Sequence, residues 1–157
     1  MTGKLGEEIA QHQPFPTLEE EAALNILRTA DAYDRHVSSI LKPWRLTPTQ
    51  YNALRILRGA DERGHTCSAI SKRMLTRDPD VTRLIDRLEA RHLVARTRDP
   101  DDRRAVMIRL TDEGRALVDQ LDAPIETMHL AQLSHLGPDK LRELITLLEA
   151  SREKVPG

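Results

Sequence analysis

Apolar residues recur at helical spacing through the first part of the chain, after a polar stretch. Thr17 with Glu20 three residues later forms a capping box, a common start of a helix. Apolar positions then follow at intervals of three and four residues: Leu24, Leu27, Ala30, Tyr33, Val37, Ile40 and Leu41. The pattern predicts a first helix of roughly seven turns that ends before Pro43. The polar residues 1–16 are typical of a loose arm.

A second helix is predicted from residue 47 to near Gly59. The segment Thr-Pro-Thr-Gln at 47–50 combines a capping threonine, a proline at the first helical position and a glutamine at the third. The apolar positions that follow are Tyr51, Leu54, Ile56 and Leu57. Their spacing supports an amphipathic helix.

Two shorter helices joined by a tight turn come next. Residues 66–74 predict a short helix, and Asp78 followed by Pro79 predicts a new N-cap and a helix that extends to Ala90. The apolar face of this later helix consists of Val81, Leu84, Ile85 and Leu88. The residues left outside are Arg77, Asp80, Thr82, Arg83 and Arg87. Together the two helices form a helix-turn-helix.

A β-hairpin and two further helices complete the pattern. Between Leu93 and Thr111, two β-prone runs flank a tip that carries three aspartates and the adjacent Arg103 and Arg104. A helix then begins at Thr111, with a bend expected at proline 124, and a last helix follows the Gly-Pro break at 137–138. The fold class is therefore mainly α with a small β-hairpin. We find no internal repeat or linker, and we expect one domain over 1–157.

Charge is distributed unevenly along the chain. The net charge is -1 over 157 residues, yet the segment from Arg63 to Arg109 holds twelve Lys or Arg against seven Asp or Glu, a local charge of +5. The flanks therefore sum to -6. A basic centre suits an anionic partner, and the acidic ends serve another purpose.

Several classes of site are not indicated. The single cysteine, Cys67, excludes an internal disulfide, and no two of the six histidines have the i, i+4 spacing of a helical metal site. No Gly-rich phosphate loop or nucleophile–base pair appears, so we expect no enzyme, no metal and no cofactor. Without an apolar membrane span or a signal-peptide core, we expect no membrane contact and a cytoplasmic location.

Four segments of the chain, taken in order, resemble the MarR-type regulators. These are Leu-Thr-Pro-Thr-Gln-Tyr-Asn-Ala-Leu at 46–54, Arg-Leu-Ile-Asp-Arg-Leu-Glu-Ala-Arg-His-Leu-Val-Ala-Arg at 83–96, Asp-Pro-Asp-Asp-Arg-Arg at 99–104 and Leu-Thr-Asp-Glu-Gly at 110–114. The resemblance covers roughly residues 20–150. His92 departs from it, because the family commonly has glycine there. A left-handed backbone costs His more than Gly, so we expect a small strain without a change of fold.

The resemblance implies a winged helix-turn-helix that acts as a homodimer. The DNA-binding lobe would be 47–111, and the dimerisation helices would be 17–45 and 112–152. The sequence agrees, since the terminal helices carry more apolar positions than one thin domain covers. A two-fold dimer would place two recognition helices roughly 34 Å apart on double-stranded DNA and read a pseudo-palindrome.

Candidate DNA-binding residues follow from this resemblance. On the recognition helix they are Arg77, Asp80, Thr82, Arg83 and Arg87, which would meet base edges or phosphates in the major groove. Asp80 is equally explained by the helix macrodipole, which we favour for that residue. At the wing tip, Asp102 would orient the guanidinium of Arg104 for the minor groove, while Arg103 would contact a phosphate. An ordinary charged hairpin is the alternative interpretation of the tip.

The regulatory ligand and the function class remain open. Relatives of this type often bind small aromatic anions, and the candidate lining residues here are Tyr33, His36, Trp44 and Tyr51, although core packing explains them equally well. Cys67 could act as a thiol redox sensor, but a small half-buried residue is the commoner explanation. The leading hypothesis is a ligand-released repressor. The alternative is a winged-helix module that binds a protein or a small molecule without DNA.

Overall fold

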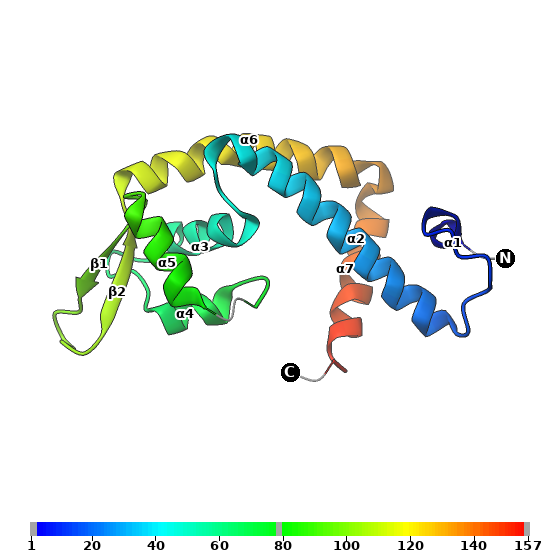
Figure 1. The fold of residues 1–157 in the computed structure, drawn as a ribbon, viewed down its shortest axis with the longest axis horizontal. Helices are drawn as coiled ribbons and strands as arrows, with labels where there is room; N and C mark the ends of the chain where they lie inside the picture. The colour runs from blue at the N-terminus through cyan, green and yellow to red at the C-terminus, as the bar shows by residue number, and fades with distance from the viewer. Residues whose placement is uncertain (1–2, 78–79, 156–157) are drawn as a thin grey trace. The chain divides into compact units, whose positions relative to one another are not determined.

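The computed structural model describes residues 3–77 and 80–155 and divides the chain into two compact units, Met1–Tyr51 and Asn52–Gly157. Each unit is mainly helical, and the only paired strands in the described part form one two-stranded sheet (Figure 1). The fold class expected from the sequence is confirmed. Within residues 3–77 and 80–155, no helix is both long and apolar enough to cross a membrane.

The first unit contains α1 (Lys4–Glu8), α2 (Leu18–Leu41), the 3-10 helix η1 (Lys42–Trp44) and the start of α3 (Pro48–Arg58). Thr17 caps α2 as predicted, with its hydroxyl accepting the Glu20 N–H at 3.1 Å. At the start of α3 the predicted capping box is also formed, since Thr47 Oγ1 accepts the Gln50 N–H at 3.2 Å and Gln50 Oε1 accepts the Thr47 N–H at 3.0 Å.

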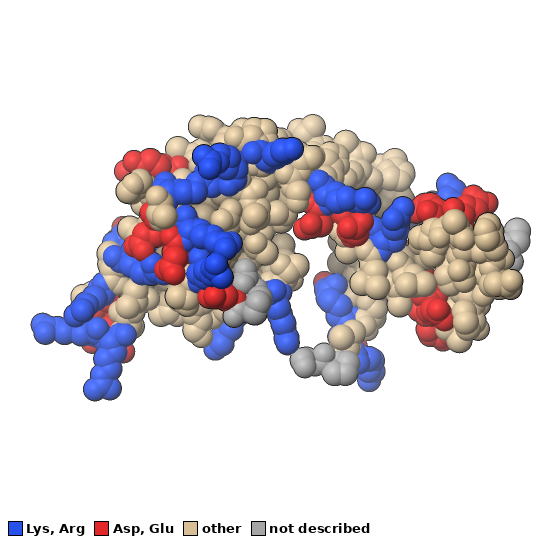
Figure 2. All heavy atoms as spheres, viewed as in Figure 1, with Lys and Arg blue, Asp and Glu red and all other residues tan. Residues whose placement is uncertain are grey.

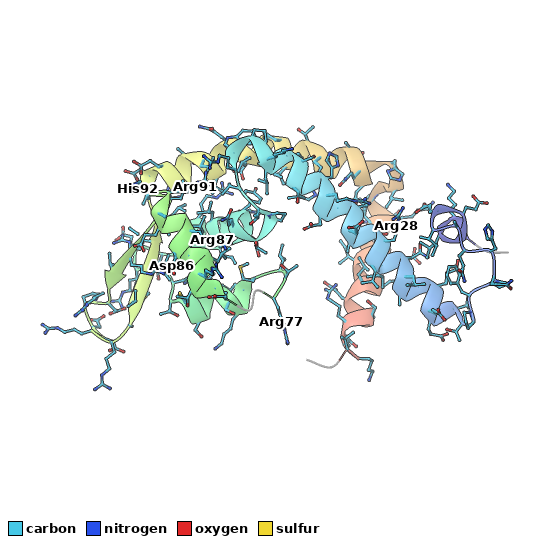
Figure 3. The ribbon with its side chains drawn as sticks, in the orientation of Figure 1. Arg28, Arg77, Asp86, Arg87, Arg91 and His92 are labelled. Carbon is cyan, nitrogen blue, oxygen red and sulfur yellow. The ribbon has the colours of Figure 1, made fainter. Side chains whose placement is uncertain are left out.

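The expectation of a loose N-terminal arm is wrong for residues 3–8. Leu5 on α1 is only 3% exposed, and the Gly3 N–H donates to Glu21 Oε1 at 3.2 Å. Arg28 on α2 forms an ion pair with Glu8 at 3.5 Å (Figure 3). A five-residue helix is too short to be stable by itself, so these contacts with α2 hold it in place.

The second unit contains the rest of α3, α4 (Cys67–Arg73), α5 (Val81–Ala90), β1 (Val94–Arg98), β2 (Val106–Leu110), α6 (Asp112–Leu133), η2 (Ser134–Leu136) and α7 (Gly137–Arg152). Its core is aliphatic, with fully buried side chains contributed by α3, α4, α5, β2 and α6: Leu54, Ile70, Ile85, Leu88, Ile108, Val118 and Leu121. The antiparallel hairpin of β1 and β2, residues 94–110, is called the wing below. In Figure 1 it lies beside α5, and its loop extends away from the helices.

One residue beyond the predicted hairpin joins the wing. His65 forms an antiparallel bridge with Ile108, with reciprocal backbone hydrogen bonds of 3.0 and 2.8 Å. The loop before α4 is thereby tied to β2. The sequence carries no strand signal at this single position, and only tertiary contact forms it.

The turn from α5 into the wing has the strained backbone expected at His92. His92 has φ +59°, and the Leu93 N–H donates to Leu88 O at 3.1 Å, as in a Schellman C-cap. The next junction is also tight, because a Cβ on Gly114 would lie 2.1 Å from Leu93 O. Thr111 Oγ1 accepts the Gly114 N–H at 3.0 Å, which confirms the predicted start of α6.

Candidate nucleic-acid interface

Helix α5 separates its apolar and polar residues cleanly. The buried face consists of Val81, Leu84, Ile85 and Leu88, each 6% exposed or less. Thr82, Arg83 and Arg87 are exposed. Arg77 is exposed on the segment before the helix, and Figure 3 labels it on that loop and Arg87 on α5. The helix therefore presents cations and a hydroxyl to solvent while its other side anchors it in the core.

Asp80 is the N-cap of α5. Its Oδ1 accepts the Arg83 N–H at 2.9 Å, and the helix begins at Val81. Asp78 and Pro79, where the sequence predicted the cap, lie outside the described residues. Capping of the helix is enough to explain a carboxylate at this position. This agrees with the helix-terminus explanation favoured for Asp80 over a contact with DNA bases.

The tip of the wing is organised by its own aspartates. Asp99 Oδ1 accepts the backbone N–H groups of Asp101 at 2.8 Å and Asp102 at 3.2 Å, and Asp101 pairs with Arg63 at 3.0 Å. These two backbone hydrogen bonds, together with the charge of Arg63, lower the pKa of Asp99. The tip is thus a defined turn, and the loop that contains Arg63 supports it.

Asp102 holds the backbone of Arg104, where we expected it to hold the guanidinium. Asp102 Oδ1 accepts the Arg104 N–H at 3.0 Å. Within the described part of the chain, neither Arg103 nor Arg104 forms an ion pair, and both are exposed. On the face seen in Figure 2, Lys and Arg side chains project from the end of the wing and gather along α5. The wing therefore offers two guanidinium groups that pair with no carboxylate among residues 3–77 and 80–155.

A different arginine of the wing is occupied. Arg96 on β1 donates through Nη2 to Asp86 Oδ1 at 2.5 Å and through Nη1 to Glu89 Oε2, and both carboxylates belong to α5. Burial alone would lower the pKa of Arg96, but the hydrogen bonds to Asp86 and Glu89 more than offset that effect and raise it. An ionic cluster therefore joins β1 to α5.

A second cluster joins α3 to α6. Arg58 donates to Asp122 at 2.7 and 2.9 Å and to Asp119 at 2.8 Å. The hydrogen bond with Asp122 is the largest cause that raises the pKa of Arg58, and it lowers the pKa of Asp122. The bidentate geometry gives this contact directional strength. It fixes the first helix of the second unit against the long α6.

The sequence analysis missed both clusters. Asp86 and Glu89 have the i, i+3 spacing of one helical face, which is a detectable signal, but nothing along the chain shows that Arg96 reaches them. The same holds for Arg58, because its partners Asp119 and Asp122 each lie more than sixty residues farther along the chain.

The four predicted ligand-site residues occupy the first unit, on three of its elements. Tyr33 is half-buried on α2, where burial raises its pKa, and His36 on the same helix is exposed. Trp44 is half-buried in η1, and Tyr51 on α3 is 6% exposed. A polar surface pocket of about 180 Å³ in the second unit, bordered by Asp61, Glu62, Arg109 and Arg115 among others, contains none of these four residues.

The described residues hold no group of three or more His, Cys, Asp or Glu side chains arranged to bind a metal ion. Cys67 is a free thiol at the first residue of α4 and is half-buried. Its role as a redox sensor stays a prediction.

Comparison with known proteins agrees with this geometry. The model of the MarR family matches residues 46–106, the segment from α3 to the wing. The chain is 33% identical over 142 residues to the uncharacterized HTH-type transcriptional regulator YkoM of Bacillus subtilis (strain 168), covering 86% of this chain and 89% of that protein.

Solved structures share both fold and sequence. A MarR transcription factor from Planctomyces limnophilus is 43% identical, with a TM-score of 0.65 over 87% of this chain and 98% of that one. CouR from Rhodococcus jostii RHA1 is 26% identical, with a TM-score of 0.74 over 91% and 99% of the two chains. CouR has been solved bound to p-coumaroyl-CoA and, separately, bound to a 23-mer DNA duplex.

Proposed function

Because this chain belongs to the MarR family of transcriptional regulators, we propose that it binds a specific sequence of double-stranded DNA as a homodimeric repressor. The observation that carries the proposal is the set of exposed cations on α5 and at the wing tip. At the tip, no carboxylate of the described chain neutralises Arg103 or Arg104. A helix for the major groove followed by a basic wing is the arrangement that winged helix-turn-helix proteins use.

Roles on α5, the recognition helix in this proposal, follow from position. Thr82 and Arg83 lie in its first turn, and the N-terminal residues of such a helix contact base edges. Arg83 would make the bidentate contact to guanine that arginine favours. Arg77 and Arg87 flank this turn and would contact phosphates. Asp80 would act on DNA indirectly, by capping the helix.

Roles at the wing differ between its two arginines. Arg104 would enter the minor groove, where a cation meets concentrated negative potential, and Arg103 would contact a phosphate. Asp102 would set the direction of Arg104 through the 3.0 Å hydrogen bond to its backbone N–H.

A second copy of the chain would cover the exposed apolar residues of the terminal helices. On α2, Leu27 is 65% exposed, and on α7, Leu144 and Leu147, which lie three residues apart on one face, are 36% and 61% exposed. Apolar residues repeated along a helix face call for a partner. A two-fold pair would read two half-sites about one DNA turn apart, and the 23-mer duplex bound by CouR is about two turns long.

A small aromatic anion would release the DNA. The proposal rests on Tyr33, His36, Trp44 and Tyr51 in the first unit. CouR, a family member solved with p-coumaroyl-CoA, supports the aromatic character of the ligand and not its small size. Such a ligand would act by binding more tightly to a dimer whose recognition helices no longer match the half-site spacing.

Selection of duplexes from a random pool by the full chain tests the proposal. We expect a pseudo-palindrome, with affinity lost by about 1–3 kcal/mol in Arg83→Ala. Lys154→Ala, which removes an exposed cation beyond the end of α7 and outside the helices assigned to the dimer, is the matched control and should bind normally. Enrichment of no sequence would favour a winged-helix module that binds something other than DNA. Equal affinity in the wild type and Arg83→Ala would overturn the role given to Arg83.

A further inference from the structure

We infer that Arg96 is a positioning residue which holds the wing at a fixed angle to α5, so that the tip and the helix can engage one stretch of DNA together. The inference rests on the proposed DNA binding and goes beyond it. It separates the arginines of the wing into two kinds, those free to meet DNA and one that is committed to the protein.

The contacts of Arg96 span the gap between two elements. Arg96 lies at the middle of β1, opposite Ile108 in the strand register. Its backbone N–H donates to Glu89 Oε1 at 3.3 Å, and its guanidinium reaches both Glu89 and Asp86 on α5. Three donors of one residue therefore bind two successive turns of the helix. A hairpin connected to α5 only at its base gains a second point of attachment farther along the strand.

Burial distinguishes Arg96 from the arginines of the tip. Its side chain is 25% exposed, whereas Asp86 and Glu89 are 58% and 40% exposed. Arg103 and Arg104 are exposed and make no ion pair in the described chain. An arginine that already satisfies two carboxylates has little left to offer a phosphate, because its contacts would have to be broken first.

The cluster also adjusts the charge of α5. Asp86 and Glu89 are carboxylates on the helix that would approach the phosphate backbone, where negative charge opposes binding. Arg96 offsets part of that charge from the protein side. Loss of Arg96 would thus loosen the wing and leave two carboxylates uncompensated beside the DNA.

A mutant cycle tests the inference. The affinity for the selected duplex is measured for the wild type, Arg96→Ala, the double variant Asp86→Asn with Glu89→Gln, and all three changes together. We expect Arg96→Ala to weaken binding about tenfold, and we expect the same change to have little effect in the double variant, since residues of one network are coupled. An equal loss in both backgrounds would mean that Arg96 contacts DNA directly and would overturn the inference, as would unchanged affinity in Arg96→Ala.

Hydrogen exchange of the free protein separates this inference from the proposed function. Backbone amides of residues 99–105 should exchange faster in Arg96→Ala than in the wild type, whether or not the chain binds DNA, and the charge-swapped variant R96E/E89R should restore slow exchange. A random pool that yields no bound duplex would refute the proposed function and leave the positioning role standing. Unaltered exchange at the tip would refute the positioning role and leave the proposed function standing.

Discussion

Replacement of His92 by glycine should stabilise the protein, because the residue occupies a backbone region that costs a side chain free energy. His92 has φ +59°, and its side chain is exposed. The contacts of the turn are made by its backbone: the N–H donates to Glu89 O at 2.8 Å, and the carbonyl accepts from Thr111 Oγ1 at 2.7 Å. Glycine keeps both of these hydrogen bonds.

The size of the effect is a difference of two terms. A left-handed conformation costs a non-glycine residue about 1–2 kcal/mol, which His92→Gly relieves. Glycine also increases the entropy of the unfolded chain, at a cost of about 0.4–1 kcal/mol. The expected net gain in the free energy of unfolding is therefore about 0–1.6 kcal/mol, centred near 0.8 kcal/mol.

Urea unfolding followed by circular dichroism, at one fixed protein concentration, measures this gain. The concentration is held constant because the stability of a dimer depends on it. Ala90→Gly, two residues earlier at the end of α5, is the matched control and should lower the midpoint, since helical φ gives glycine no advantage there. If His92→Gly destabilised the protein as much as Ala90→Gly does, strain at His92 would not be the controlling term.

Four further predictions concern the other junctions of the fold. Arg58→Ala should lower the free energy of unfolding by about 1–2 kcal/mol at neutral pH, measured by urea titration, because two partly exposed carboxylates lose their partner. Arg58 holds the pKa of Asp122 below its usual range, so the stabilisation is present above about pH 3.9 and is lost as pH falls through the lowered pKa. The free energies of unfolding of wild type and Arg58→Ala should therefore converge in acid. A gap that stays constant with pH would contradict this. Gly114→Ala should lower the melting temperature, because its Cβ would meet a backbone carbonyl oxygen at 2.1 Å, whereas Gly59→Ala, with 3.7 Å to its nearest neighbour, should not. Leu147→Asp on α7 should shift the protein toward monomer in sedimentation velocity; an unchanged dimer would place the interface elsewhere.

Local chemistry explains which elements the sequence could predict. Thr17, Thr66 and Thr111 each cap the helix that follows through a hydroxyl contact three residues ahead, so these helix starts are encoded within one turn of chain. The left-handed backbone of His92 is likewise set by the local turn that ends α5. The start of α5 was placed at Asp78, whereas the residue that caps it is Asp80.

Contacts between distant segments explain what the sequence could not predict. The short α1 is held in place by its contacts with α2, and the bridge of His65 to the wing forms only where the loop meets β2. The pairing of Arg96 with α5 likewise crosses from strand to helix. Side-chain spacing along an element indicates which residues share a face, but it does not indicate what that face meets.

The salt dependence of binding to the selected duplex tests the central claim most directly. Fluorescence anisotropy at several salt concentrations should give an affinity that falls steeply with salt, with a slope of about 0.9 for each phosphate contact on a logarithmic scale. Arg103→Ala should reduce that slope by about one contact, while Lys154→Ala, beyond the end of α7, should leave it unchanged. Binding that does not vary with salt, or a slope identical in all three proteins, would contradict the assignment of the wing and α5 as a DNA-binding surface.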